Sequence, residues 1–123
     1  MRMIIRSKWA LTPAMLAAVL LSAMHANAGE AEPTAEECTK AVMEAQEMAA
    51  RLSRKSMSRY VAERHLHTAN AEAGASEFDG CLEFAAKAVE EVQTRSSRLA
   101  PGKVFRATTS TGDIELRGDD QDD

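Results

Sequence analysis

Apolar residues recur at steps of three and four along residues 35–53, which places them on one face of an α-helix. They are Cys38, Ala41, Val42, Ala45, Met48, Ala49 and Leu52. Thr34 followed by Glu37 matches a capping box, a pattern typical of a helix start. The sequence therefore predicts a first helix over about residues 35–53.

Two later segments show the same periodicity. The first contains Tyr60, Val61, Leu66, Ala69 and Ala73 and predicts a helix over about residues 57–73, which Gly74 can end as a C-cap. The second contains Phe78, Cys81, Leu82, Ala85, Val89 and Val92 and predicts a helix over about residues 77–99, with Ser76 as its N-cap. Together the patterns predict an all-α domain over residues 29–101, a small three-helix bundle.

Residues 102–123 are rich in acids and polar residues, and we expect them to form a flexible acidic tail. Apolar and polar residues alternate around Ser110–Asp113, a pattern that could form a hairpin if a partner supplied a surface. Alone, two such strands are only marginally stable. The apolar residues of this tail are candidate docking residues: Val104, Phe105, Ile114 and Leu116.

The first 28 residues have the three parts of a secretory signal in the right order. Arg2, Arg6 and Lys8 precede an apolar run at residues 14–23, and Ala26-Asn27-Ala28 provides a small-x-small cleavage site. The run is shorter than the roughly 20 apolar residues that span a bilayer. We therefore expect residues 1–28 to be a signal peptide, the protein to be periplasmic or secreted, and no membrane span to remain after cleavage. An uncleaved anchor is the alternative.

Cleavage would make the exported chain more acidic. The first 28 residues hold three of the 15 basic residues and none of the 19 acidic ones, so the formal charge would go from −4 to 12 minus 19, or −7. A net charge of this sign disfavours non-specific nucleic-acid binding, and we expect no nucleic-acid partner.

The two cysteines, Cys38 and Cys81, are expected to form a disulfide in an oxidising compartment. Periodicity alone also allows one long helix over residues 35–73, folded back as a hairpin that forms a crosslinked dimer or structural subunit. In that hairpin the two cysteines would lie ~45 Å apart at 1.5 Å per residue, whereas a disulfide needs Cα atoms within ~7 Å. The three-helix bundle permits an internal bond, so we expect a monomer rather than a dimer.

Basic residues gather at the predicted first turn: Arg51, Arg54, Lys55 and Arg59. The third helix would bring Arg95 and Arg98 to the same end of the bundle. Helix macrodipoles explain most of this arrangement, since bases favour helix C-termini. The same cluster is a candidate contact surface for a partner protein or for an anionic envelope surface.

Histidines and methionines raise a metal-handling alternative, carried by His65 and His67 with the methionines upstream. Residues two apart on a helix point about 200° apart, so these histidines cannot chelate one ion together, and we expect no metal and no cofactor. No catalytic motif is found. The sequence therefore favours a non-enzymatic exported protein that acts by contact, such as an adaptor, an inhibitor or a small chaperone-like binder.

Overall fold

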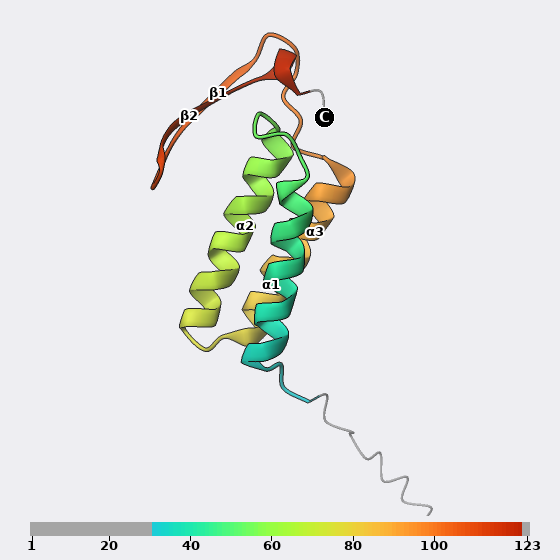
Figure 1. Cartoon of the computed structure of the whole chain (residues 1–123), viewed down its shortest axis with the longest axis vertical. Coiled ribbons are helices and arrows are strands. Elements are labelled where there is room, and N and C mark those ends of the chain that lie inside the picture. The colour runs from blue at the N-terminus through green and yellow to red at the C-terminus, as the bar shows by residue number, and fades with distance from the viewer. Residues whose placement is uncertain (1–30, 122–123) are drawn as a thin grey trace, which may run out of the picture.

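The computed structural model describes residues 31–121, so the predicted signal peptide lies outside the described residues, as do Asp122 and Asp123. Three helices pack side by side as a bundle, and a two-stranded hairpin arches over one end of it (Figure 1). The elements are α1 (Ala35–Ala50), α2 (Met57–Gly74), α3 (Phe78–Thr94), β1 (Val104–Thr109), β2 (Gly112–Arg117) and a short 3-10 helix (Gly118–Asp120). None of the helices in this part of the chain is long and apolar enough to cross a membrane.

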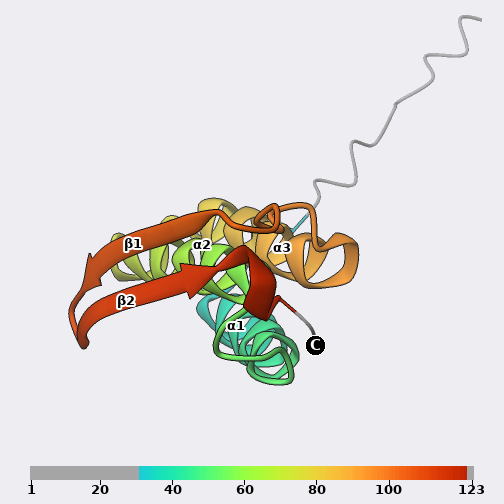
Figure 2. The same ribbon diagram turned by 90° about the horizontal axis from the view of Figure 1, so that it is seen from above.

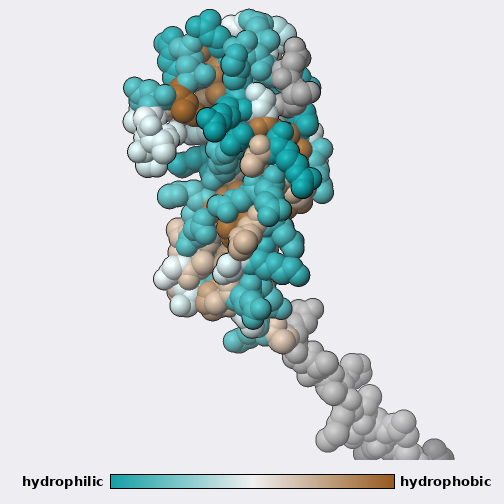
Figure 3. Space-filling model, in the orientation of Figure 1, coloured by the Kyte–Doolittle hydropathy of each residue, from teal (hydrophilic) through white to brown (hydrophobic). Residues whose placement is uncertain are grey.

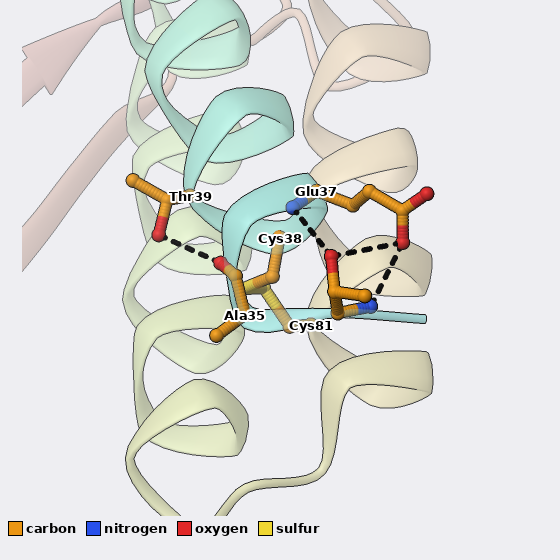
Figure 4. The surroundings of a disulfide bond; sticks show 6 residues. Ala35, Glu37, Cys38, Thr39 and Cys81 are labelled. Atoms are coloured by element: carbon orange, nitrogen blue, oxygen red, sulfur yellow. Dashed lines mark hydrogen bonds between the residues drawn. A yellow bond between two sulfur atoms is a disulfide. The ribbon is translucent and has the colours of Figure 1, made fainter. Parts of the chain in front are cut away.

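The start of α1 is the predicted capping box. The Glu37 amide donates to Thr34 Oγ1 at 3.2 Å, and the Thr34 amide donates to Glu37 Oε2 at 2.8 Å. Figure 4 shows this cap beside the disulfide in the first turn of the helix. The helix ends at Ala50, three residues earlier than expected, and the chain turns before Met57.

The ends of α2 and α3 differ in detail from the expected caps. Gly74 is the last residue of α2 rather than its left-handed cap, and the positive φ of 63° falls at Ser76 instead. The N-cap of α3 is Glu77, which makes no side-chain cap hydrogen bond. The helix stops at Thr94 because Arg95 adopts the left-handed conformation with φ 50°.

Small side chains dominate the buried core between the helices. Six of its residues are alanines, which let helix backbones approach closely, and Val42 and Leu66 are its larger members. The alanines are Ala45, Ala49, Ala62, Ala69, Ala85 and Ala88. The core sits along the length of the bundle and leaves the hairpin to one end.

A disulfide joins Cys38 in the first turn of α1 to Cys81 in the first turn of α3, with Cα atoms 5.8 Å apart. Both cysteines are fully buried. The internal disulfide and the helical bundle are therefore confirmed, and the long-helix hairpin is wrong because the chain turns between Ala50 and Met57. Such a bond indicates an oxidising compartment outside the cytoplasm.

The segment expected to be a flexible tail contains a β-hairpin, so the molecule is not purely all-α. Strand β1 pairs antiparallel with β2, with Phe105 opposite Leu116 and Ala107 opposite Ile114. The bundle itself supplies the surface that two isolated strands lack. The Phe105 ring lies 5.0 Å from the Tyr60 ring of α2, and Leu116 is only 3% exposed.

Gln121 fastens the end of the hairpin segment to the turn between α1 and α2. Its Nε2 donates to the Lys55 carbonyl at 2.6 Å and to the Arg117 carbonyl at 3.0 Å. Its Oε1 accepts from the Met57 amide at 2.9 Å, which satisfies a free donor at the start of α2. The side chain is 4% exposed, so these bonds are protected from water.

Candidate functional site: the hairpin end

Two stretches distant in sequence meet at one end of the molecule: residues 51–59, which form the turn into α2, and residues 95–121, which carry the hairpin. We call them together the hairpin end. Figure 1 shows both stretches at the end of the bundle opposite the disulfide, and Figure 2 shows the two strands lying over the helices when seen from above. The hydrogen bonds of Gln121 join the two stretches directly.

Charge is strongly segregated between the hairpin end and the rest of the described chain. The hairpin end has nine basic and four acidic residues, a formal net charge of +5. The remainder, residues 31–50 and 60–94, has three basic and twelve acidic residues, a net charge of −9. Helix dipoles do not explain this whole difference, because three of the nine basic residues, Lys103, Arg106 and Arg117, belong to the hairpin segment rather than to a helix C-terminus.

The four predicted basic residues have different surroundings. Arg59 is largely buried and structural, since its guanidinium donates to the Leu52 carbonyl at 2.9 Å and pairs with Glu63 at 2.8 Å. Lys55 is exposed and its Nζ lies 3.7 Å from Asp120 Oδ2. Arg51 and Arg54 are exposed, and neither makes an ion pair or hydrogen bond through its side chain within the described residues. Arg51 and Arg54 are therefore the two available for contact.

The predicted docking residues of the tail are also divided. Phe105 and Leu116 face the bundle and attach the hairpin to it. Ile114 is half-buried on the same face. Val104 belongs to the opposite face and is 49% exposed, one of two large apolar residues that are exposed in the described chain. Of these four, Val104 alone is presented openly to a partner.

The outer face of the hairpin carries charges that the sequence reasoning did not single out. Glu115 Oε2 lies 2.7 Å from Arg106 Nε across the strands, and its Oε1 lies 2.6 Å from Arg117 Nη2. Hydrogen bonds from Arg106 and Arg117 hold the pKa of the Glu115 carboxyl below its ordinary value. Strict alternation of side chains along β1 could have grouped Val104 with Arg106, but only if the strand had been expected to form.

A groove of about 360 Å³ lies between the inner face of the hairpin tip and α2. Tyr60, Glu63, Arg64 and His67 line it from the helix, and Ile114 with residues 108–111 lines it from the hairpin. The lining mixes aromatic, charged and hydroxyl groups. Figure 3 shows hydrophilic side chains over most of the visible face, with apolar side chains gathered in patches between them.

The structure does not bring the two histidines together. His65 stacks against Phe84 with ring centroids 6.2 Å apart, whereas His67 lines the groove beside the hairpin. Within residues 31–121, no group of three or more His, Cys, Asp or Glu side chains could hold a metal ion.

Glu91 is the buried acid of the bundle, at 7% exposure, and it anchors the start of the hairpin end. Its carboxylate accepts from Ser96 Oγ at 2.6 Å and from the Ser97 amide at 2.9 Å. Burial raises the pKa of this carboxyl. Hydrogen bonds from Ser96 and Ser97 lower the pKa by more than burial raises it, so the net shift is downward.

Comparison of the chain with protein-family models, with curated proteins and with solved structures finds no match in any of the three.

Proposed function

We propose that the chain is an exported, periplasmic or secreted protein that acts by contact rather than by chemistry, and that the hairpin end is its contact surface. The partner is a protein or an anionic envelope surface. Roles of this kind include an adaptor, an inhibitor or a small chaperone-like binder. The observation that carries the proposal is the charge segregation, +5 at the hairpin end against −9 on the rest of the described chain.

Three features support this assignment. The signal-like pattern in residues 1–28 and the disulfide agree on an oxidising compartment. The hairpin packs over one end of the bundle, and its two strands pair only with each other within the described chain. Exposed strand edges and unpaired cations are both surfaces that partners recognise.

Site-specific photo-crosslinking tests the proposal in cells that export the full chain. A photoreactive amino acid replaces Ser110 at the hairpin turn in one variant and Asn70 on α2 in the matched control. Both residues are neutral, polar and exposed, so neither change alters the charge or the core. Adducts are then identified by mass under denaturing conditions, with proteins and lipids both scored.

We expect adducts from position 110 and none above background from position 70. Equal adducts from the two positions would show that the hairpin end is not the contact surface. A complete lack of adducts at position 110, in a variant that is exported and disulfide-bonded, would contradict the proposal as a whole.

A further inference from the structure

We propose that the hairpin end binds an anionic lipid surface, with Val104 entering the headgroup region and the surrounding cations contacting lipid phosphates. This inference rests on the proposed function above and names its partner. It is carried by the juxtaposition of one exposed apolar side chain with basic residues on the outer face of the hairpin.

Val104 lies beside basic residues at the start of the hairpin. Val104 is 49% exposed, lies opposite Arg117 across the strands, and follows Lys103 in the chain. Arg106 is two residues along the same strand and therefore on the same face. An apolar side chain within a ring of cations suits a lipid interface, where the apolar group meets the acyl boundary and the cations meet the headgroups.

The carboxylates of the hairpin end do not neutralise all of its cations. Arg106 and Arg117 share the single carboxylate of Glu115, so this cluster of three keeps a net charge of +1. Lys103, Arg51 and Arg54 are exposed, and no side-chain ion pair is present for any of the three in the described chain. The hairpin end therefore presents unneutralised positive charge from both of its stretches.

The charge distribution of the described chain favours one orientation toward an anionic surface. The remainder of the described chain has a net charge of −9, and seven of its twelve acids lie near the end of the bundle that holds the disulfide. An anionic surface attracts the hairpin end and repels this acidic part, so only an end-on approach is favourable. A protein partner with a small acidic patch would not require such segregation over the whole molecule.

The test uses protein recovered from the exported fraction, disulfide intact, and vesicles of two compositions. One is pure phosphatidylcholine, and the other contains about one third phosphatidylglycerol, a fraction that gives a negative surface potential. We expect co-sedimentation with the anionic vesicles at low salt, none with the neutral ones, and release as salt shortens the screening length.

Two matched triple variants separate a local contact from net charge. Arg51→Gln, Arg54→Gln and Lys103→Gln together should weaken binding on the order of a hundredfold, from about fivefold for each cation lost near the surface. Lys40→Gln, Arg64→Gln and Lys87→Gln together make the same change in net charge on the acidic part. This control should change binding by no more than about threefold, because none of its three side chains belongs to the outer face of the hairpin or to the turn before α2.

Val104→Ser tests the apolar contact and should weaken binding about fivefold without altering its salt dependence. All the substituted side chains of the first triple and Val104 are exposed, so circular dichroism and an unchanged disulfide should show intact folds. Glycerol phosphate at constant ionic strength should not displace the protein, whereas full displacement would assign the site to free phosphate and overturn the lipid inference.

Failure of this inference is distinguishable from failure of the proposed function. If the anionic vesicles do not bind while position 110 crosslinks to a protein, the lipid inference is overturned and the contact function stands. Equal weakening by the two triple variants would likewise overturn it. Absence of both vesicle binding and crosslinks would overturn the two together.

Discussion

The helical bundle and the hairpin differ in where their order comes from. The bundle has a contiguous buried core along all three helices and a disulfide between two of them. The hairpin fully buries one of its own apolar side chains, Leu116, and is otherwise attached through Phe105 and Gln121. We therefore expect the bundle to fold without the hairpin and the hairpin to depend on the bundle. On this expectation the proposed contact surface belongs to the less stable of the two regions, as binding segments commonly do.

Removing the disulfide should lower the free energy of unfolding of the bundle more than any of the other proposed substitutions. The bond joins residues 43 positions apart, and the chain-entropy model gives ~4 kcal/mol of stabilisation for a loop of that length. The Cys38→Ser, Cys81→Ser double variant should therefore lose about that much free energy of unfolding in urea titrations. A loss below about 1 kcal/mol would show that the alanine-rich core holds the bundle without the crosslink.

Truncating one leucine in each region tests whether the two differ in cooperativity. Leu66 is 3% exposed in the bundle core and Leu116 is 3% exposed under the hairpin. Leu66→Ala should lower the free energy of global unfolding by about 3 kcal/mol. Leu116→Ala should leave global unfolding nearly unchanged and should speed amide exchange in residues 104–117.

Met43→Ala is the control for these two substitutions, because Met43 is 57% exposed and should change stability by less than about 0.5 kcal/mol. If Leu116→Ala destabilises the whole molecule as much as Leu66→Ala does, the hairpin and the bundle are one cooperative unit and the comparison fails.

The smallest expected effect is a pH dependence of the free energy of unfolding, caused by Glu91 where the bundle meets the hairpin end. Because the pKa of Glu91 in the folded protein is below its ordinary value of 4.5, its ionised form stabilises the fold. This contribution is present above the unfolded pKa and is lost as pH falls from about 4.5 through the lowered folded pKa. Glu91→Gln should abolish it, so wild type and variant should converge in stability as the solution is acidified.

Urea titrations of both proteins between neutral and acidic pH would measure this difference. A constant gap across that range would mean that Glu91 contributes through packing alone. Glu91→Gln should also loosen residues 95–98, since Ser96 and Ser97 donate to this carboxylate.

Much of the bundle could be predicted from the sequence, because helix periodicity and capping are local. The capping box at Thr34 and Glu37 is present as expected, and the two cysteines correctly excluded the long helix. Helix ends were less accurate. The first helix stops at Ala50, and Arg59, nine residues on, donates to that carbonyl as well as to Leu52. No local pattern reveals that Arg59 turns inward to do so.

The candidate site was only partly predictable, because contacts between distant residues leave no local pattern in the sequence. The basic cluster at residues 51–59 was visible as composition, but which members remain available was not. Phe105 and Leu116 look like free docking residues in the sequence and are used internally. Lys103, Arg106 and Arg117 gain significance only when the hairpin forms and places them around Val104.

By itself, the sequence determined the three helices, the pairing of the cysteines and the overall sign of the charge. These depend on spacing along the chain and on the distance that a disulfide permits. Only the tertiary structure decided that residues 104–117 are ordered and that Lys103, Arg106 and Arg117 join the basic residues at this end. The hydrogen bond from Met57 to Gln121 spans 64 positions, and Leu116 is buried because a bundle surface lies beneath it. Two marginal strands become ordered through such long-range contacts, which no local pattern encodes.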